Sequence, residues 1–242
     1  MLRRDPGALA ILFLMPLVFI LVMSLAFSNV VSSDVAAQRN VPAYTLFGVF
    51  FIVQYLAASI LDERRLGTLQ RILVTRATSI DLMAGKLLGA LLVNTVQIAV
   101  MFAAGVFVLP LFGVPALNLQ ANPLGLVLVS LVASLTAGGL GLLLAAVARS
   151  YEQVSGLGLM IVLPLAILGG VMVPRDQLPP FMQTLGLLSP HTWALNAYEQ
   201  LLIADAELIA VLPNIAILCA FAFAFYSAAV AFLRHSMYRT YN

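Results

Sequence analysis

The sequence predicts an all-α membrane protein with six transmembrane helices, a cytoplasmic helix between spans 2 and 3, and two short external re-entrant helices before span 6. Composition is the first observation, because 62% of the 242 residues are hydrophobic and only 9% are charged, with a mean hydropathy of +1.06. Soluble domains are about 45–50% apolar and about 25% charged, so a water-soluble globule is excluded. The lengths of the charge-free runs and the uneven distribution of Lys and Arg are the other two observations.

The charge-free runs set the number of spans. A bilayer core of about 30 Å requires about 20 helical residues. Four charge-free runs are long enough for one span each, and the run 87–148 is long enough for two. Prolines and asparagines in the segment 110–123 break this long run midway. The six predicted spans are therefore about 7–27, 42–61, 84–109, 123–147, 153–173 and 209–233.

A further charge-free stretch, residues 177–198, predicts external helices rather than a seventh span. It carries Pro179 and several polar or aromatic groups that a lipid-facing helix would struggle to satisfy. Two short helices within about 177–205, lying at the outer interface, fit these residues better. Trp193 and Tyr198 are predicted to be interfacial anchors.

The basic residues set the orientation. With six spans, ten of the twelve Lys and Arg residues fall on one side of the membrane, and only Arg39 and Arg175 fall on the other. The positive-inside rule then places both termini in the cytoplasm. A seventh span would strand Arg234 and Arg239 outside, which disfavours it. The protein is predicted to be a multi-pass protein of the cell membrane.

The whole chain, residues 1–242, is predicted to form a single transmembrane domain in contact with membrane lipid. Its first apolar run of about 20 residues exceeds the 7–15 residues of a cleaved signal peptide, so we expect a retained helix. The single cysteine, Cys219, excludes an intrachain disulfide and a zinc cluster, and no metal site is predicted. Basic residues are spread among the loops rather than pooled in one patch, so no nucleic-acid partner is predicted.

The predicted cytoplasmic helix, about 62–76, is amphipathic. One interpretation is a helix lying on anionic headgroups; the other is a short lever that plugs into a soluble partner. Gly67 favours the lever, because a mid-helix glycine costs up to about 1 kcal/mol relative to alanine, and close backbone approach or a kink would explain it. The apolar stripe at helical spacing consists of Leu66, Leu69, Ile72 and Leu73, and the charged residues beside it include Glu63, Arg64 and Arg71.

Three segments resemble type-2 ABC exporter permeases. The run DERRLGTLQRILVTRATSIDLMAGKLLG resembles the loop that follows the second helix of that family, and RDPGALAILFLMP resembles its start. The third segment, residues 169–202, resembles the external signature of the family. The signature residues are Gly169, Gly170, Pro174, Pro179, Pro190 and Trp193. The three matches follow the family's order along almost the whole chain.

This resemblance implies a partner and a function. It implies a coupling helix that contacts a separate ATP-binding cassette ATPase subunit, and a second permease copy in a homo- or heterodimer. ATP and Mg²⁺ would bind the partner subunit, with no cofactor on this chain. The substrate would be an amphipathic or hydrophobic drug, antibiotic or lipid-like molecule. The coupling residues would be Glu63, Arg64, Leu66, Gly67, Leu69, Arg71, Ile72 and Leu73.

The chain departs from the family in two places. Members usually carry an amphipathic elbow helix before the first span, whereas five residues precede the span here, which leaves open a truncated start or an absent elbow. Many members also carry a large external domain between the first two spans, whereas residues 28–41 are too few for one. A P-loop requires G-x-x-x-x-G-K-[ST]; Gly85-Lys86 is followed by Leu87, so no nucleotide site and no enzyme activity is predicted.

Other function classes find little support. An ion-coupled carrier or a channel is the alternative, but such proteins usually bury an acid or base at mid-membrane, and the spans hold only Lys86 near one end. An intramembrane hydrolase would need more than His191 and His235, which lie far apart in sequence. Mild polar and small residues in the spans predict either interhelical contacts or a translocation path: Asn94, Gln97, Ser130, Ser134 and Gly138.

Overall fold

The computed structural model describes residues 6–27, 33–67, 79–120 and 122–239. The described chain is built of helices and turns without strands, which confirms the predicted all-helical class. The α-helices are α1 (Pro6–Phe27), α2 (Ser33–Arg65), α4 (Ser79–Phe107), α5 (Pro123–Val147), α6 (Tyr151–Leu168), α7 (Pro180–Gly186), α8 (Pro190–Leu202) and α9 (Leu208–Arg239), and the 3₁₀ helices are η2 (Leu109–Phe112) and η3 (Arg175–Gln177).

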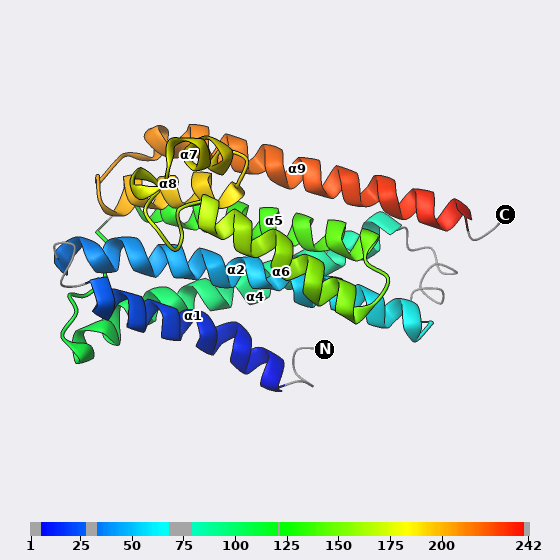
Figure 1. Cartoon of the computed structure of the whole chain (residues 1–242), viewed down its shortest axis with the longest axis horizontal. Coiled ribbons are helices and arrows are strands. Elements are labelled where there is room, and N and C mark those ends of the chain that lie inside the picture. The colour runs from blue at the N-terminus through cyan, green and yellow to red at the C-terminus, as the bar shows by residue number, and fades with distance from the viewer. Residues whose placement is uncertain (1–5, 28–32, 68–78, 121, 240–242) are drawn as a thin grey trace.

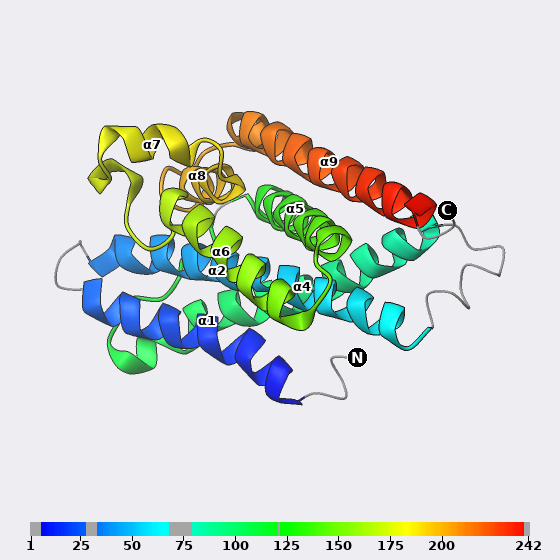
Figure 2. The same cartoon turned by 45° about the vertical axis from the view of Figure 1, so that its right-hand side comes forward.

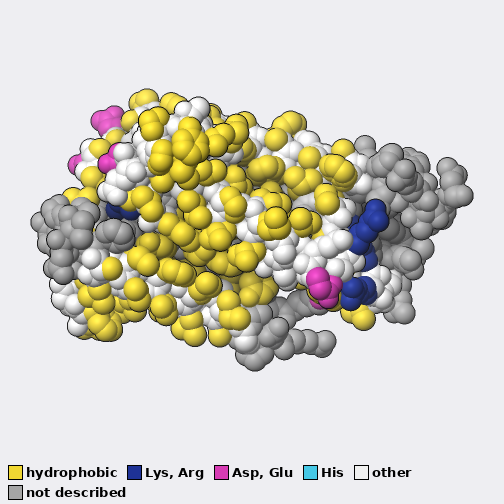
Figure 3. Space-filling model, viewed as in Figure 1, with side chains coloured by type: hydrophobic (Ala, Val, Ile, Leu, Met, Phe, Trp, Pro, Cys, Tyr) yellow, Lys and Arg dark blue, Asp and Glu magenta, His cyan; other side chains and the backbone are white. Residues whose placement is uncertain are grey.

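The long helices have the length and polarity of membrane spans. Five of them, α2, α4, α5, α6 and α9, are long and apolar enough to cross a bilayer, and α1 adds a shorter apolar segment, Ala10–Ala26. A broad hydrophobic band covers the middle of the molecular face in Figure 3, with charged side chains toward its two ends. This distribution is that of a multi-pass membrane protein.

Helix α2 lies at the centre of the bundle. It contacts α1, α4, α5, α6 and α8, and Figures 1 and 2 show it running through the middle with α1 and α9 on opposite sides. Its large side chains Tyr44 and Phe50 are fully buried, which is unusual for a lipid-facing helix and expected for a central one. Movement of α2 would therefore reach almost every other helix.

The long helices alternate in direction, so the connections gather at two ends (Figure 1). One end holds the end of α2, the start of α4 and the α5–α6 turn. The other end holds η2 and the short helices α7 and α8. This arrangement agrees with the predicted placement of the cytoplasmic and external segments on opposite sides, and we call these the inner and outer ends.

Several helix ends differ from the predicted span boundaries, although each predicted span falls on a helix. The helix expected at 42–61 begins at Ser33 and contains Pro42. Arg39, which was expected to precede the span, lies inside this helix and pairs with Glu199. The helix expected at 209–233 continues to Arg239. Charged residues end a membrane crossing, but they do not end a helix.

Two other helices differ from the prediction by five residues at one end and by two at the other. The helix expected at 84–109 begins at Ser79, and the helix expected at 153–173 ends at Leu168. The next residues, Gly169 and Gly170, end this helix: the Gly170 φ of +88° leaves the helical region. By contrast, α5 matches the predicted span 123–147 at both ends, because the Asn122 side chain accepts a hydrogen bond from the Gly125 amide and caps it.

Candidate functional site

The predicted cytoplasmic helix over 62–76 is wrong in its first part. Residues 62–65 form the last turn of α2, and the chain then turns at Leu66 and Gly67. The Leu66 amide donates to Asp62 O at 2.9 Å and the Gly67 amide donates to Arg64 O at 3.3 Å. The Gly67 φ of +69° is the left-handed conformation that ends many helices at glycine.

Gly67 is therefore a helix terminator and not a mid-helix residue. A Cβ at this position would have no described atom within 4 Å, so the close backbone approach that we expected does not occur within the described chain. Leu66 is 70% exposed beside it. The remaining predicted coupling residues, Leu69, Arg71, Ile72 and Leu73, lie outside the described residues.

An ion pair joins the two ends of the α2–α4 connection. Lys86 Nζ of α4 lies 2.6 Å from Glu63 Oε1 and donates a hydrogen bond to Ser59 Oγ. The side chains of Lys86 and Glu63 are only 18% and 22% exposed. Glu63 was predicted to contact the partner ATPase, but its carboxylate is engaged by Lys86, for which the sequence predicted only a position near one end of a span.

A second contact at the inner end reaches α6. The guanidinium carbon of Arg65 lies 4.5 Å from the centre of the Tyr151 ring, a cation–π geometry worth about 0.5–1 kcal/mol at an exposed position. Tyr151 is the first residue of α6. The last turn of α2 is thus attached to α4 through Glu63 and to α6 through Arg65.

Gln97 and Asn94, predicted together on one face of α4, are both fully buried. The Gln97 side-chain amide donates to Leu12 O of α1 at 2.8 Å. Proline has no amide hydrogen, so Pro16 leaves this carbonyl without its helical partner, and Gln97 supplies the missing donor. Both polar side-chain atoms of Asn94 lack a hydrogen-bond partner within the described part of the chain.

The predicted small and polar residues of α5 contact neighbouring helices. Ser130 Oγ lies 2.7 Å from the hydroxyl of Tyr198 in α8, and Ser134 Oγ donates to Ser130 O within its own helix. Gly138 faces the Leu87 side chain of α4 so closely that a Cβ would collide with it. The geometry of these residues supports the helix-packing interpretation that the sequence left open.

The predicted external signature residues shape the turns at the outer end. Gly169 lies against His191, since a Cβ at Gly169 would be 2.5 Å from the His191 Cβ. Pro174, Pro179 and Pro190 stand at the starts of η3, α7 and α8 respectively. Trp193 Nε1 donates to Leu187 O at 2.9 Å and thereby fixes α8 to the turn before it.

Two aromatic residues of α8, Tyr198 and His191, are fully buried. Tyr198 is fully buried rather than an interfacial anchor, and burial raises the pKa of its phenol well above the usual range. His191 is also fully buried, with its ring centre 4.0 Å from that of Phe50. Burial lowers the His191 pKa to about 3, so the ring is neutral at physiological pH. Ser189 Oγ donates to Leu165 O at 2.6 Å and accepts from the His191 amide.

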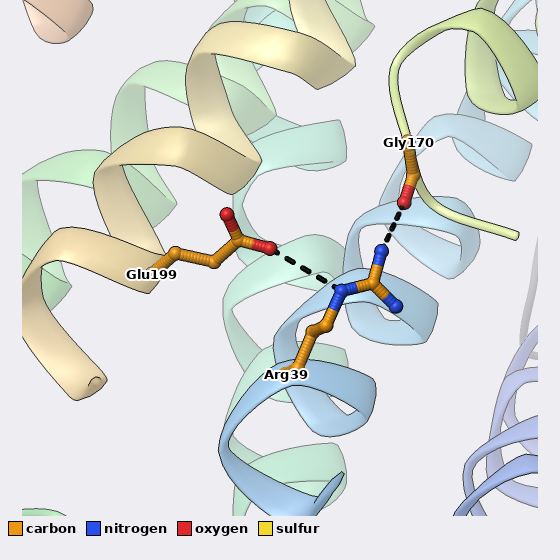
Figure 4. A network of polar contacts seen from close by, with 3 residues as sticks. All are labelled: Arg39, Gly170 and Glu199. Atoms are coloured by element: carbon orange, nitrogen blue, oxygen red, sulfur yellow. Dashed lines mark hydrogen bonds and ion pairs between the residues drawn. The ribbon is translucent and has the colours of Figure 1, made fainter. Parts of the chain in front are cut away.

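A polar network at the outer end was missed by sequence reasoning. Arg39 Nε of α2 lies 3.4 Å from Glu199 Oε1 of α8, and Arg39 Nη2 donates to Gly170 O at 2.7 Å (Figure 4). Burial raises the pKa of Glu199, and the Arg39 charge partly opposes this shift. The available signal was Arg39, one of the two outer arginines, and Glu199 in the external segment, but nothing in the sequence pairs residues so far apart.

The described residues do not form a candidate metal-binding site. Within the described ranges, no group of three His, Cys, Asp or Glu residues lies close enough together to hold a metal ion. The polar residues instead form helix caps, interhelical hydrogen bonds and two ion pairs near the two ends of α2. These contacts join α2 to α4, α6 and α8.

Sequence comparisons show which known proteins this chain resembles. The model of the ABC-2 type transporter family matches residues 1–203. The linearmycin resistance permease protein LnrN of Bacillus subtilis is 26% identical over 84% of this chain and 50% of its own length. The inner membrane transport permease YhhJ of Escherichia coli is 28% identical over 74% and 47%. The daunorubicin resistance ABC transporter permease protein DrrB1 of Streptomyces coeruleorubidus is 26% identical over 83% and 70%. The chain spans about half the length of the first two relatives.

Proposed function

The chain belongs to the ABC-2 type transporter family as a transmembrane permease without a nucleotide-binding site of its own, and from this premise we propose that it is the membrane subunit of an ATP-driven exporter. A separate ATPase subunit would bind ATP and Mg²⁺. The observation that carries the proposal is the family match over residues 1–203, which includes the α2–α4 connection and the external helices α7 and α8.

We place six spans in the cell membrane with both termini in the cytoplasm. The five long apolar helices and the shorter apolar α1 would supply these crossings, and the excess of Lys and Arg at the inner end supports the orientation. Two copies of the chain, or one copy and a related permease, would form the translocation path between them. Asn94, Gln97 and the packing residues of α5 would hold the helices that border this path.

The α2–α4 connection would receive the movement of the ATPase. It lies at the inner end, begins with the exposed Leu66 and follows the helix terminator Gly67. Its predicted apolar residues would enter a groove of the ATPase, and ATP binding would displace them. Central α2 would pass this displacement to the helices around it.

The substrate would be an amphipathic or hydrophobic compound such as a drug or antibiotic. Two relatives are named for resistance to linearmycin and daunorubicin, and a third for multidrug transport. The candidate spans of the chain are strongly apolar, and the described charges are concentrated toward the helix ends. A route between such helices suits an apolar molecule better than a strongly charged one.

Transport in inverted membrane vesicles tests this function. The chain would be co-expressed with the ATPase that co-purifies with it in mild detergent, and uptake of daunorubicin and of linearmycin would be followed. We expect ATP-dependent uptake of at least one compound, and none when the Walker-A lysine of the ATPase is replaced. Uptake at the full rate without nucleotide, or the failure of any ATPase to associate with the chain, would contradict the proposal.

A further inference from the structure

We propose that Lys86 is a positioning residue of the transport cycle, which makes α2 and α4 move as one unit when the connection between them is displaced. This inference rests on the proposed function and deepens it, because it names the contact that passes movement into the bundle. The sequence pattern assigned no such role to Lys86. The geometry at the inner end does.

Lys86 reaches two side chains of α2 at once. Ser59 and Glu63 are four residues apart, so they lie one above the other on the same face of the helix. The Lys86 ammonium is 2.6 Å from Glu63 Oε1 and donates to Ser59 Oγ. Two contacts on successive turns hold the lysine more firmly than a single surface pair, because the side chain cannot pivot freely about either contact.

Most of the surface of the pair is shielded from water, so losing one partner is costly. Glu63 Oε2 is buried without a hydrogen-bond partner in the described chain, and its carboxylate therefore depends on Lys86 for stabilisation. Removing one member of a buried ion pair leaves an uncompensated charge and is far more disruptive than removing an exposed pair. The outer pair is held less closely, since Arg39 Nε and Glu199 Oε1 are 3.4 Å apart, with side chains 17% and 33% exposed.

The position of the pair suits a mechanical role. Glu63 lies in the last turn of α2, immediately before Gly67 ends the helix, and Lys86 lies in the third turn of α4. A displacement of the connection would splay the two helices if nothing joined them at its base. With the pair in place, the same displacement moves both helices, and the Arg65–Tyr151 contact carries it to α6.

This role differs from a direct contact between Glu63 and the ATPase. If Glu63 contacted the partner, Lys86 would be dispensable and reversing both charges would not restore function. If Glu63 acts through Lys86, the reversed pair would restore the attraction with its sign exchanged. The two roles therefore make opposite predictions for the same set of variants.

The experiment compares Glu63→Lys, Lys86→Glu and the double exchange in the vesicle assay with daunorubicin and linearmycin. The number of drug molecules exported per ATP hydrolysed is measured, because a merely structural defect lowers transport and hydrolysis together. We expect a fall of at least tenfold in this ratio for each single variant and recovery to within threefold of wild type for the double exchange. Arg149→Glu, a reversal at an exposed arginine of the same end, is the matched control and should stay within twofold.

Lys86→Met keeps the length of the side chain but removes its charge. This variant provides a second test if the charge-reversed variants do not reach the membrane. Its export per ATP should fall at least tenfold while its ATP hydrolysis stays within threefold of wild type. Normal export by wild type together with unchanged export per ATP in the Lys86 variants would overturn this inference alone. Absence of ATP-dependent export by wild type would overturn the proposed function, and this inference with it.

Discussion

The side-chain amide of Gln97 donates a hydrogen bond to the backbone carbonyl of Leu12 at 2.8 Å, and this carbonyl is the one that Pro16 leaves unpaired four residues later in α1. In a bilayer no water is available to satisfy such a carbonyl. The contact explains why a glutamine occurs in the middle of an apolar span. It also ties α1, at the edge of the bundle, to α4.

Replacement of Gln97 by Leu should lower the free energy of unfolding by about 1–2 kcal/mol, because it leaves the Leu12 carbonyl without a donor. In a Pro16→Ala background the alanine amide would pair with that carbonyl, so the same replacement should cost about 1 kcal/mol less. Unfolding in detergent measures both values. Equal costs in the two backgrounds would contradict the explanation, and Thr95→Ala on the exposed face of α4 is the control.

Gly48 allows α2 to approach this contact closely. A Cβ at Gly48 would lie 2.6 Å from both Gln97 Nε2 and Pro16 Cγ. Gly48→Ala should therefore lower the free energy of unfolding by about 1–3 kcal/mol through overpacking. The control is Gly156→Ala in α6, where a Cβ would meet no described atom within 4 Å; it should be neutral or stabilising by up to about 1 kcal/mol. Similar effects at both sites would argue against close packing at Gly48.

At Gly67 the backbone conformation matters, and not the space around it. Gly67→Leu should abolish transport while membrane insertion remains intact, because a left-handed residue with a branched side chain costs about 1–2 kcal/mol and would redirect the chain after α2. Gly67→Asn should retain most transport, since asparagine adopts this conformation readily. Vesicle transport normalised to membrane abundance measures both. Equal loss in Leu and Asn variants would indicate that the site requires glycine for a close contact with a partner.

His191 predicts a specific dependence of stability on pH. Its pKa is lowered from 6.5 to about 3 in the folded state, so the unfolded state binds more protons between these values and stability falls as the pH drops through this window. Between pH 7 and pH 5 the wild type should lose about 2 kcal/mol more than His191→Phe. Unfolding in detergent, followed by the fluorescence of Trp193, the single tryptophan, gives this difference. A variant with the same pH profile as wild type would show that the histidine is not buried as described.

The locations of the spans were predictable because the bilayer imposes a length that the sequence must satisfy. The match of α5 to the predicted 123–147 shows this best, since Asn122 and Pro123 are local start signals. The true start of α2 at Ser33 was not predictable in the same way. Arg39 suggested that the span began after it, but a charged residue does not end a helix, and the pairing with Glu199 of α8 accommodates the charge.

The inner end was predicted only in part, because its contacts also join helices that are distant in the sequence. The sequence indicated that residues 62–76 were important, but the pairing of Glu63 with Lys86 depends on how α2 and α4 pack. Gly67 was expected within a helix because the amphipathic pattern continues past it. The backbone ends the helix there, and a hydrophobic pattern alone does not reveal a left-handed residue.

Photo-crosslinking would reveal whether a separate ATPase engages this chain at the inner end, just beyond α2. A photoreactive amino acid would replace Leu66, which is 70% exposed at the inner end, or Leu188, which is 69% exposed at the outer end. In a complex that transports drug, we expect Leu66 to capture a chain with a Walker-A motif and Leu188 to capture none. Capture at Leu188 but not at Leu66, in a complex that transports drug, would contradict the account.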